Sequence, residues 1–144
     1  MHRSLAALVP LLLVAGCNST DGSAGNARAV ETGRWILTSY RTAGGLRVVP
    51  AGVTADATFK DGTVSGSGGC NGYSGTCTVS GSTLNIRDVN ATMMACDGPR
   101  SEVEQAYLAA LPTAAAFTVT AGKLTILDGT GAVILEYTGG PARG

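Results

Sequence analysis

Residues 65–79 read SGSGGCNGYSGTCTV, which places five glycines and two cysteines in one short stretch. Glycine loses more backbone freedom on folding than any other residue, so its concentration in a folded chain needs a reason. A phosphate-binding loop, a catalytic loop and a turn tied by a disulfide would each place glycines around a cysteine. The rest of the chain decides among these three explanations.

The stretch lacks the features of a phosphate-binding loop. The pattern G-x-x-x-x-G-K-[ST] is absent, and no lysine follows the glycines before Lys123. Gly66 and Gly68 precede a predicted strand rather than a helix, so no helix N-terminus is available to an anion.

Cysteine catalysis is also disfavoured, and no catalytic residue is predicted. A nucleophilic thiolate needs a histidine or a helix N-terminus to lower its pKa. The one histidine is His2, in a segment that we expect to be removed. Cys96 precedes a predicted helix, but in an oxidising compartment the commoner fate of such a cysteine is a disulfide. Without histidine or closely paired cysteines a zinc site is disfavoured too, so we expect no metal and no cofactor.

The composition indicates one folded domain. The chain has 144 residues, of which 44% are hydrophobic and 14% charged. This balance supports a hydrophobic core and argues against a disordered chain or a nucleic-acid-binding protein. The formal net charge is zero, so no charged partner is implied. The 21 glycines follow no G-x-y period and indicate tight turns rather than collagen.

The N-terminal sequence MHRSLAALVPLLLVAGC predicts an exported protein. Arg3 and the apolar run at 5–14 are typical of a secretory signal, and the run is too short for a stable transmembrane helix. Residues 14–17 (VAGC) resemble a bacterial lipobox, which implies cleavage before Cys17 and a lipid, such as palmitate, on its thiol. Two or more acyl chains anchor a protein stably to a membrane. An ordinary signal peptide with a stray cysteine is the alternative.

These features divide the chain into four parts. We expect a lipoprotein signal peptide at residues 1–16, a flexible tether at 17–31, a folded domain at 32–138 and a disordered tail at 139–144. The tether is small, polar and without periodicity, as flexible linkers are. Asn18 is not acidic, which is compatible with sorting to an outer membrane, facing the periplasm, if the cell has two membranes.

Strand patterns dominate the predicted domain. Residues 34–40 (RWILTSY) are rich in aromatic and β-branched side chains, and a loop with Gly44, Gly45 and Pro50 follows them. Asp61-Gly62 predicts a two-residue hairpin turn. The predicted strands cover residues 34–40, 55–60, 63–66, 76–80, 82–87, 117–120, 123–127 and 132–137.

One helix is predicted over residues 99–111. Pro99 suits the first turn, Asp97 or Gly98 is a candidate cap, and Pro112 ends the helix. The predicted helix has an apolar stripe, so it must lie on the sheet or plug one end of a barrel. The fold class is therefore α+β to mainly β, a curved antiparallel sheet or small barrel-like meander with one packed helix. The stripe consists of Val103, Tyr107, Ala110 and Leu111.

Two motifs in this order resemble those of the META/HslJ-like domain family. Gly69-Cys70-Asn71 matches the family's Gly-Cys-Asn motif, and residues 92–96 (TMMAC) match its Thr-x-Met-x-Cys motif through Thr92, Met94 and Cys96. A helix follows the second motif, as in the family. The strand around Trp35 and the closing hairpin at 124–137 match the family's ends, so the resemblance covers about residues 30–138.

The resemblance implies a disulfide between Cys70 and Cys96. In the chain-entropy model, closing a loop of about 27 residues stabilises a fold by roughly 3.5 kcal/mol. Cys77 stands where the family usually has an aromatic residue. A Cys77–Cys96 bond is therefore the alternative, because its entropic contribution would be nearly the same. If Cys70 and Cys96 pair, Cys77 is expected to be a buried thiol on the same strand face as Val79.

The other residues of the motifs are interpreted as structural. We expect the Asn71 side chain to bond to the backbone of its turn, with ligand contact as the alternative. Tyr73, Met93 and Met94 are expected to pack rather than to form a binding surface.

The predicted function is that of a non-enzymatic envelope lipoprotein. Glu102 and Glu104 are two residues apart on a helix, so they do not face each other as an acid pair would, and we interpret them as helix-start charges. The resemblance implies a role in the heat-shock or another stress response, or in envelope integrity. The expected partners are a membrane, through the lipid, and an unknown envelope protein.

An envelope binding module, such as a protease inhibitor or a small apolar-ligand carrier, is the alternative function. An open barrel end or an exposed apolar groove would favour it, and a filled interior would oppose the carrier. A hydrolase that uses serine or aspartate is disfavoured by the low charge and the lack of imidazole.

Overall fold

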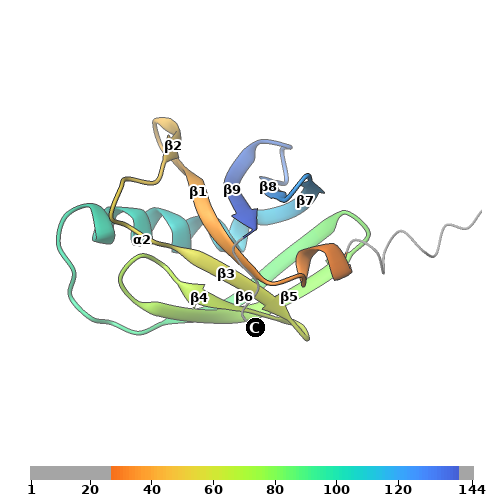
Figure 1. Cartoon of the computed structure of the whole chain (residues 1–144), viewed down its shortest axis with the longest axis horizontal. Helices are drawn as coiled ribbons and strands as arrows, with labels where there is room; N and C mark the ends of the chain where they lie inside the picture. The colour runs from red at the N-terminus through yellow and green to blue at the C-terminus, as the bar shows by residue number, and fades with distance from the viewer. Residues whose placement is uncertain (1–26, 140–144) are drawn as a thin grey trace, which may run out of the picture.

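The computed structural model describes residues 27–139. Within them nine strands form one antiparallel sheet, ordered β2-β1-β3-β4-β5-β6-β7-β8-β9. Because β1 also pairs with β9, eight strands close into a barrel and β2 remains as an extra strand (Figure 1). The predicted mainly β, barrel-like architecture is confirmed. The strands are β1 (Arg34–Thr42), β2 (Gly45–Val48), β3 (Asp56–Lys60), β4 (Thr63–Ser67), β5 (Gly72–Ser80), β6 (Thr83–Ala91), β7 (Ala114–Thr120), β8 (Lys123–Asp128) and β9 (Val133–Gly139).

Strand β1 closes the barrel by bonding to three partners. Residues 34–36 pair with β3, and residues 39–42 pair with β2 on the same side. The opposite side pairs with β9, where Leu37 faces Tyr137. The register shifts between Leu37 and Ser39, and such a bulge increases the local bend that closure requires. Closure leaves most strands without a free edge.

The hairpins follow the predicted turns, with two differences. Asp61 and Gly62 have φ of 49° and 77°, as a two-residue hairpin turn requires. β5 begins at Gly72, earlier than the predicted strand at 76–80, so with the end of β4 most of the glycine-rich stretch lies in strands. β2 lies where a loop was predicted, because its four residues are too few to show a strand pattern and are held by pairing with the end of β1.

Helix α2 (Pro99–Ala110) lies at one end of the barrel and continues into a 3-10 turn, η1 (Leu111–Thr113) (Figure 1). The predicted apolar stripe is confirmed, because its four residues are all buried. Gly98 occupies the cap position, and no side chain caps the helix.

The packed domain begins before residue 32. Residues 27–30 are helical, Val30 is fully buried, and Trp35 Nε1 donates a hydrogen bond to the Val30 carbonyl oxygen (2.7 Å). The last residues of the predicted tether therefore belong to the domain. The signal peptide, Cys17 and residues 140–144 lie outside the described residues. No helix in residues 27–139 is both long and apolar enough to cross a membrane.

The barrel interior is filled by side chains, including a chain of tyrosine hydroxyls. The Tyr107 hydroxyl lies 2.6 Å from that of Tyr73 and accepts a hydrogen bond from that of Tyr137 (3.0 Å). Tyr73 donates in turn to the Asp56 carbonyl oxygen (2.8 Å). Within residues 27–139, every buried side-chain nitrogen and oxygen has a hydrogen-bond partner. This packing opposes a carrier that would hold a ligand inside the barrel.

The same tyrosines predict a loss of stability at alkaline pH. Burial raises the pKa of Tyr73, Tyr107 and Tyr137 above the ordinary value, because the interior disfavours the phenolate. These residues ionise near pH 10 when unfolded but stay protonated when folded. The contribution of these three tyrosines to the free energy of unfolding should therefore be constant below about pH 10. Above that pH, the free energy of unfolding should fall.

Urea unfolding at several pH values, followed with tyrosinate absorbance, measures this effect. A Tyr137→Phe variant should lose stability less steeply above about pH 10. A free energy of unfolding that stays level through this range in the wild type would contradict the assignment.

Candidate functional site

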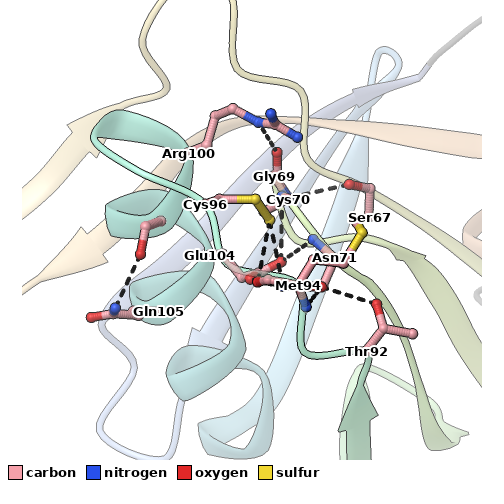
Figure 2. Close-up of a disulfide and its surroundings, with 11 residues drawn as sticks. Ser67, Gly69, Cys70, Asn71, Thr92, Met94, Cys96, Arg100, Glu104 and Gln105 are labelled. Atoms are coloured by element: carbon pink, nitrogen blue, oxygen red, sulfur yellow. Dashed lines mark hydrogen bonds between the residues drawn. A yellow bond between two sulfur atoms is a disulfide. The ribbon is translucent and has the colours of Figure 1, made fainter.

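The two sequence motifs meet at the start of α2 (Figure 2). A disulfide joins Cys70, between β4 and β5, to Cys96, which precedes α2, with 6.2 Å between their Cα atoms. This is the pairing that the family resemblance implies, rather than the Cys77–Cys96 alternative. Cys77 is a free buried thiol in β5. The disulfide therefore ties the glycine-rich turn to the segment that leads into the helix.

The buried Asn71 side chain connects three segments of the chain. Its Oδ1 accepts hydrogen bonds from the Met94 backbone N–H (2.7 Å) and the Thr92 hydroxyl (3.1 Å). Its Nδ2 donates to the Met94 carbonyl oxygen (3.2 Å) and to Glu104 Oε2 (2.7 Å). The amide thus pairs with the Met94 backbone much as a neighbouring strand would. The expectation that Asn71 bonds to its own turn is wrong about the partners, which lie in residues 92–94 and in α2.

Glu104 binds the same turn from the helix. Its Oε1 accepts hydrogen bonds from the backbone N–H groups of Asn71 (2.5 Å) and Cys70 (3.3 Å). With the Asn71 amide on Oε2, the carboxylate has three donors, and charge-assisted bonds of this kind are strong. The interpretation of Glu104 as a simple helix-start charge is wrong. One available signal was its position three residues before Tyr107, at the border of the apolar stripe.

The glycines allow the turn to approach the helix. A Cβ at Gly68 would lie only 2.8 Å from Glu104 Oε1, so a side chain there would displace the carboxylate. Gly69 has a φ of 121°, which L residues with side chains rarely adopt, and its carbonyl oxygen accepts a hydrogen bond from Arg100 Nε (3.1 Å). Residues 68–71 are therefore a structural turn tied by a disulfide, and the rest of the stretch at 65–79 lies in β4 and β5.

The two methionines do not pack as expected. Met93 is 96% exposed and Met94 is 62% exposed. Met94 joins the site through its backbone N–H and carbonyl, which Asn71 binds, so its role does not depend on its side chain. Tyr73, by contrast, is buried, and its ring packs edge-on against Tyr107. The packing prediction is thus confirmed for Tyr73 and wrong for the methionines.

The arrangement holds segments together rather than presenting reactive groups. The carboxylate of Glu104 and the amide of Asn71 are both engaged by protein donors and acceptors. In the part of the chain that the structure describes, no cluster of three or more histidine, cysteine or acidic side chains is placed to hold a metal ion.

Reducing the disulfide is expected to destabilise the domain without unfolding it. Reduction should lower the free energy of unfolding by about 3.5 kcal/mol, because the unfolded chain regains the entropy of an open loop. The bonds between Asn71, Glu104 and Met94 should keep the segments in place. Urea unfolding with and without reductant measures the difference. A Cys70→Ala/Cys96→Ala variant is the control and should not respond to reductant, and an equal midpoint for both wild-type samples would contradict the prediction.

Mapping of unreduced peptides checks the pairing directly. Cleavage after Lys60, Tyr73, Arg87 and Arg100 separates the three cysteines of the domain. The linked pair should be 61–73 with 88–100, whereas a link to 74–87 would show that Cys77 is bonded.

The comparisons with known proteins agree with this fold. The META domain family model matches residues 28–138. A protein from Burkholderia xenovorans, solved by NMR, superposes with a TM-score of 0.65 at 23% identity, covering 96% of each chain. The crystal structure of a DUF4847 family protein from Bacteroides vulgatus gives a TM-score of 0.58 at 18% identity, covering 83% of this chain and 100% of the other. These identities show a shared fold alone.

No curated protein matches the chain. The family match covers the barrel, the helix and both cysteine motifs. The chain therefore belongs to the META domain family.

Proposed function

We propose that the chain is an envelope lipoprotein, in which a lipid on Cys17 holds a non-enzymatic META domain at a membrane surface for stress response or envelope integrity. The proposal that the domain is non-enzymatic is supported by the hydrogen bonds of the motif residues. Asn71 and Glu104 are the polar residues at the centre of the two motifs. Their side chains make hydrogen bonds within the protein that stabilise the fold. The lipobox-like residues 14–17 support the anchor.

The position of residue 27 limits how far the domain would stand from its anchor. Nine residues separate Cys17 from the first described residue. The ten steps of chain from Cys17 to Ala27 reach at most about 35 Å when fully extended. The lipid would therefore keep the barrel close to the membrane surface.

The anchored end would be the end opposite the disulfide. Ala27 and Glu31 lie beside Gly62 and Cys77, around a hollow at the far end of the β3–β4 hairpin. β5 begins at Gly72, next to the disulfide, and runs toward the end of the barrel that contains this hollow. Figure 1 shows the helical residues 27–30 on the opposite side of the barrel from α2. We infer that the start of α2 and the Asn71 site face away from the membrane, toward envelope partners.

Lipid labelling tests the anchor. The full chain and its Cys17→Ala variant are expressed in a bacterium supplied with labelled palmitate. The wild type should incorporate the label and fractionate with membranes, in the outer membrane if the host has two, whereas Cys17→Ala should do neither. A Cys77→Ala variant is the matched control and should be labelled like the wild type. An unlabelled wild type that is processed and released would overturn the anchor.

A surface binding module is the second candidate, favoured by a hollow between α2 and the barrel. Its lining includes the apolar residues Ala106, Ala110 and Ile134 and the charged residues Arg41 and Asp128. Because the interior is filled, a partner would bind at this surface. An Ala109→Glu substitution would place a charge in the hollow. If the hollow binds an envelope protein, the wild type should recover that protein from native envelopes and Ala109→Glu should not, whereas equal recovery would exclude this hollow.

A further inference from the structure

The sulfur atoms of the described residues fall into two groups of very different accessibility. Cys70 and Cys96 are bonded to each other, and Cys77 is 6% exposed. Met93 and Met94 are 96% and 62% exposed. Methionine is usually buried, where its flexible thioether fills gaps in a core. Two neighbouring methionines held out in solvent therefore need an explanation other than packing.

The segment that carries them is held by its backbone and not by their side chains. Thr92 N–H donates to the Gly72 carbonyl oxygen (3.0 Å), and the Asn71 amide binds both the N–H and the carbonyl of Met94. Cys96 is fixed two residues later by the disulfide. Met93 thus lies in an anchored segment while its side chain reaches into solvent. A chemical change at either thioether would remove little packing from the fold.

We propose that Met93 and Met94 form a surface oxidation site, at which hydrogen peroxide or hypochlorous acid converts each thioether to a sulfoxide while the barrel stays folded. A sulfur lone pair attacks one peroxide oxygen, the O–O bond breaks, and the other oxygen leaves as water after proton transfer. The sulfur is oxidised by two electrons and the peroxide is reduced by two. With hypochlorous acid, chloride and a proton leave instead of water.

The thiol in the described residues does not compete for the oxidant. Burial and the nearby Glu31 carboxylate raise the pKa of Cys77 to about 11, so almost none of the reactive thiolate is present at neutral pH. The disulfide sulfurs have already been oxidised. Two-electron oxidants should therefore act on the methionine pair before they act on Cys77.

Oxidation would change the character of one surface. Met93 and Met94 border a hollow that also includes Ser101, Gln105 and Leu108 of α2. A sulfoxide is polar where the thioether is apolar, so the border of this hollow would become polar on oxidation. A sulfoxide reductase would reverse the change. This inference depends on neither the lipid anchor nor the proposed function.

Peroxide treatment of the purified full chain tests the proposal. Trypsin releases residues 88–100 (DVNATMMACDGPR) after reduction, so one peptide reports both methionines. We expect this peptide to gain two oxygens, with Met93 reacting within about 3-fold of the rate of free methionine and Met94 more slowly. The thermal midpoint of the oxidised chain should stay within about 2 °C of the untreated chain, and Cys77 should remain unmodified.

Two controls make the result decisive. A Met93→Leu/Met94→Leu variant should take up no oxygen in residues 88–100 and should keep the wild-type midpoint. The urea-unfolded chain gives the rate for fully accessible methionines. The proposal is overturned if the native chain reacts more than about 10-fold more slowly than the unfolded chain, or if oxidation unfolds the barrel.

Discussion

Replacing Asn71 with alanine should lower the free energy of unfolding by about 4 kcal/mol. The substitution removes five hydrogen bonds of a side chain that is 4% exposed. It also leaves the Met94 N–H and one oxygen of Glu104 without this partner. A buried donor or acceptor that loses its partner lowers the stability of the fold by more than the hydrogen bond contributed. This loss is largest when the group left without a partner is charged, as the Glu104 carboxylate is. The loss should appear in urea unfolding of the purified chain.

An exposed asparagine provides the matched control for this prediction. Within residues 27–139 the Asn90 side chain makes one hydrogen bond, to the nearby Asp88 carbonyl oxygen, so Asn90→Ala should change stability by less than about 0.5 kcal/mol. A Glu104→Ala variant and the Asn71→Ala/Glu104→Ala double variant complete a cycle. The two effects should not add, because both residues stabilise the same turn. If Asn71→Ala stays within about 1 kcal/mol of the wild type, the Asn71 network does not hold the fold.

A Gly66→Ala substitution is expected to destabilise the barrel by about 3 kcal/mol or more. A Cβ at Gly66 would overlap the carbonyl oxygen and Oδ1 of Asp56 on the paired strand. Asp56 has little freedom to withdraw. Its carbonyl oxygen accepts the Tyr73 hydroxyl bond, and its carboxylate pairs with Arg34 and accepts the Ser67 N–H. The added methyl group would therefore separate β3 from β4 and disturb the hydrogen bonds of the interior.

Gly129→Ala is the control, since a Cβ there would meet nothing within 4 Å. Unfolding midpoints of both variants, measured side by side, separate a local clash from a general effect of adding a methyl group. Near-wild-type stability of Gly66→Ala would show that β3 and β4 can move apart at little cost.

The parts of the fold that depend on local sequence were predictable, and those that depend on distant contacts were not. Asp61-Gly62 specifies its hairpin within two residues, and the stripe through Val103 and Tyr107 specifies the buried face of α2. β2 was missed because only pairing with β1 makes it a strand. The closure of β1 on β9 depends on a register between residues about a hundred positions apart, which no local pattern records.

The candidate site divides in the same way. The family resemblance pointed to Cys70, Asn71 and Cys96, and the structure brings all three together. It did not reveal that Glu104 binds Asn71. The position of Glu104 beside the apolar stripe indicates that its side chain lies near the core, but it does not identify a partner 33 residues away. The exposure of Met93 was missed for a related reason, since apolar residues were expected to pack and the backbone bonds that hold this segment are not visible in the sequence.

The pairing of β1 with β9 has a consequence for how the protein folds during synthesis. The first and last strands of the sheet are neighbours, so the barrel stays open until residues 133–139 have emerged and found β1. Until then β1 and β8 each carry an unpaired edge that is open to other chains, and pairing of such distant segments is slow. A chain cut short before β9 would keep that gap permanently, so we expect premature termination near the C-terminus to yield aggregates rather than a smaller working domain.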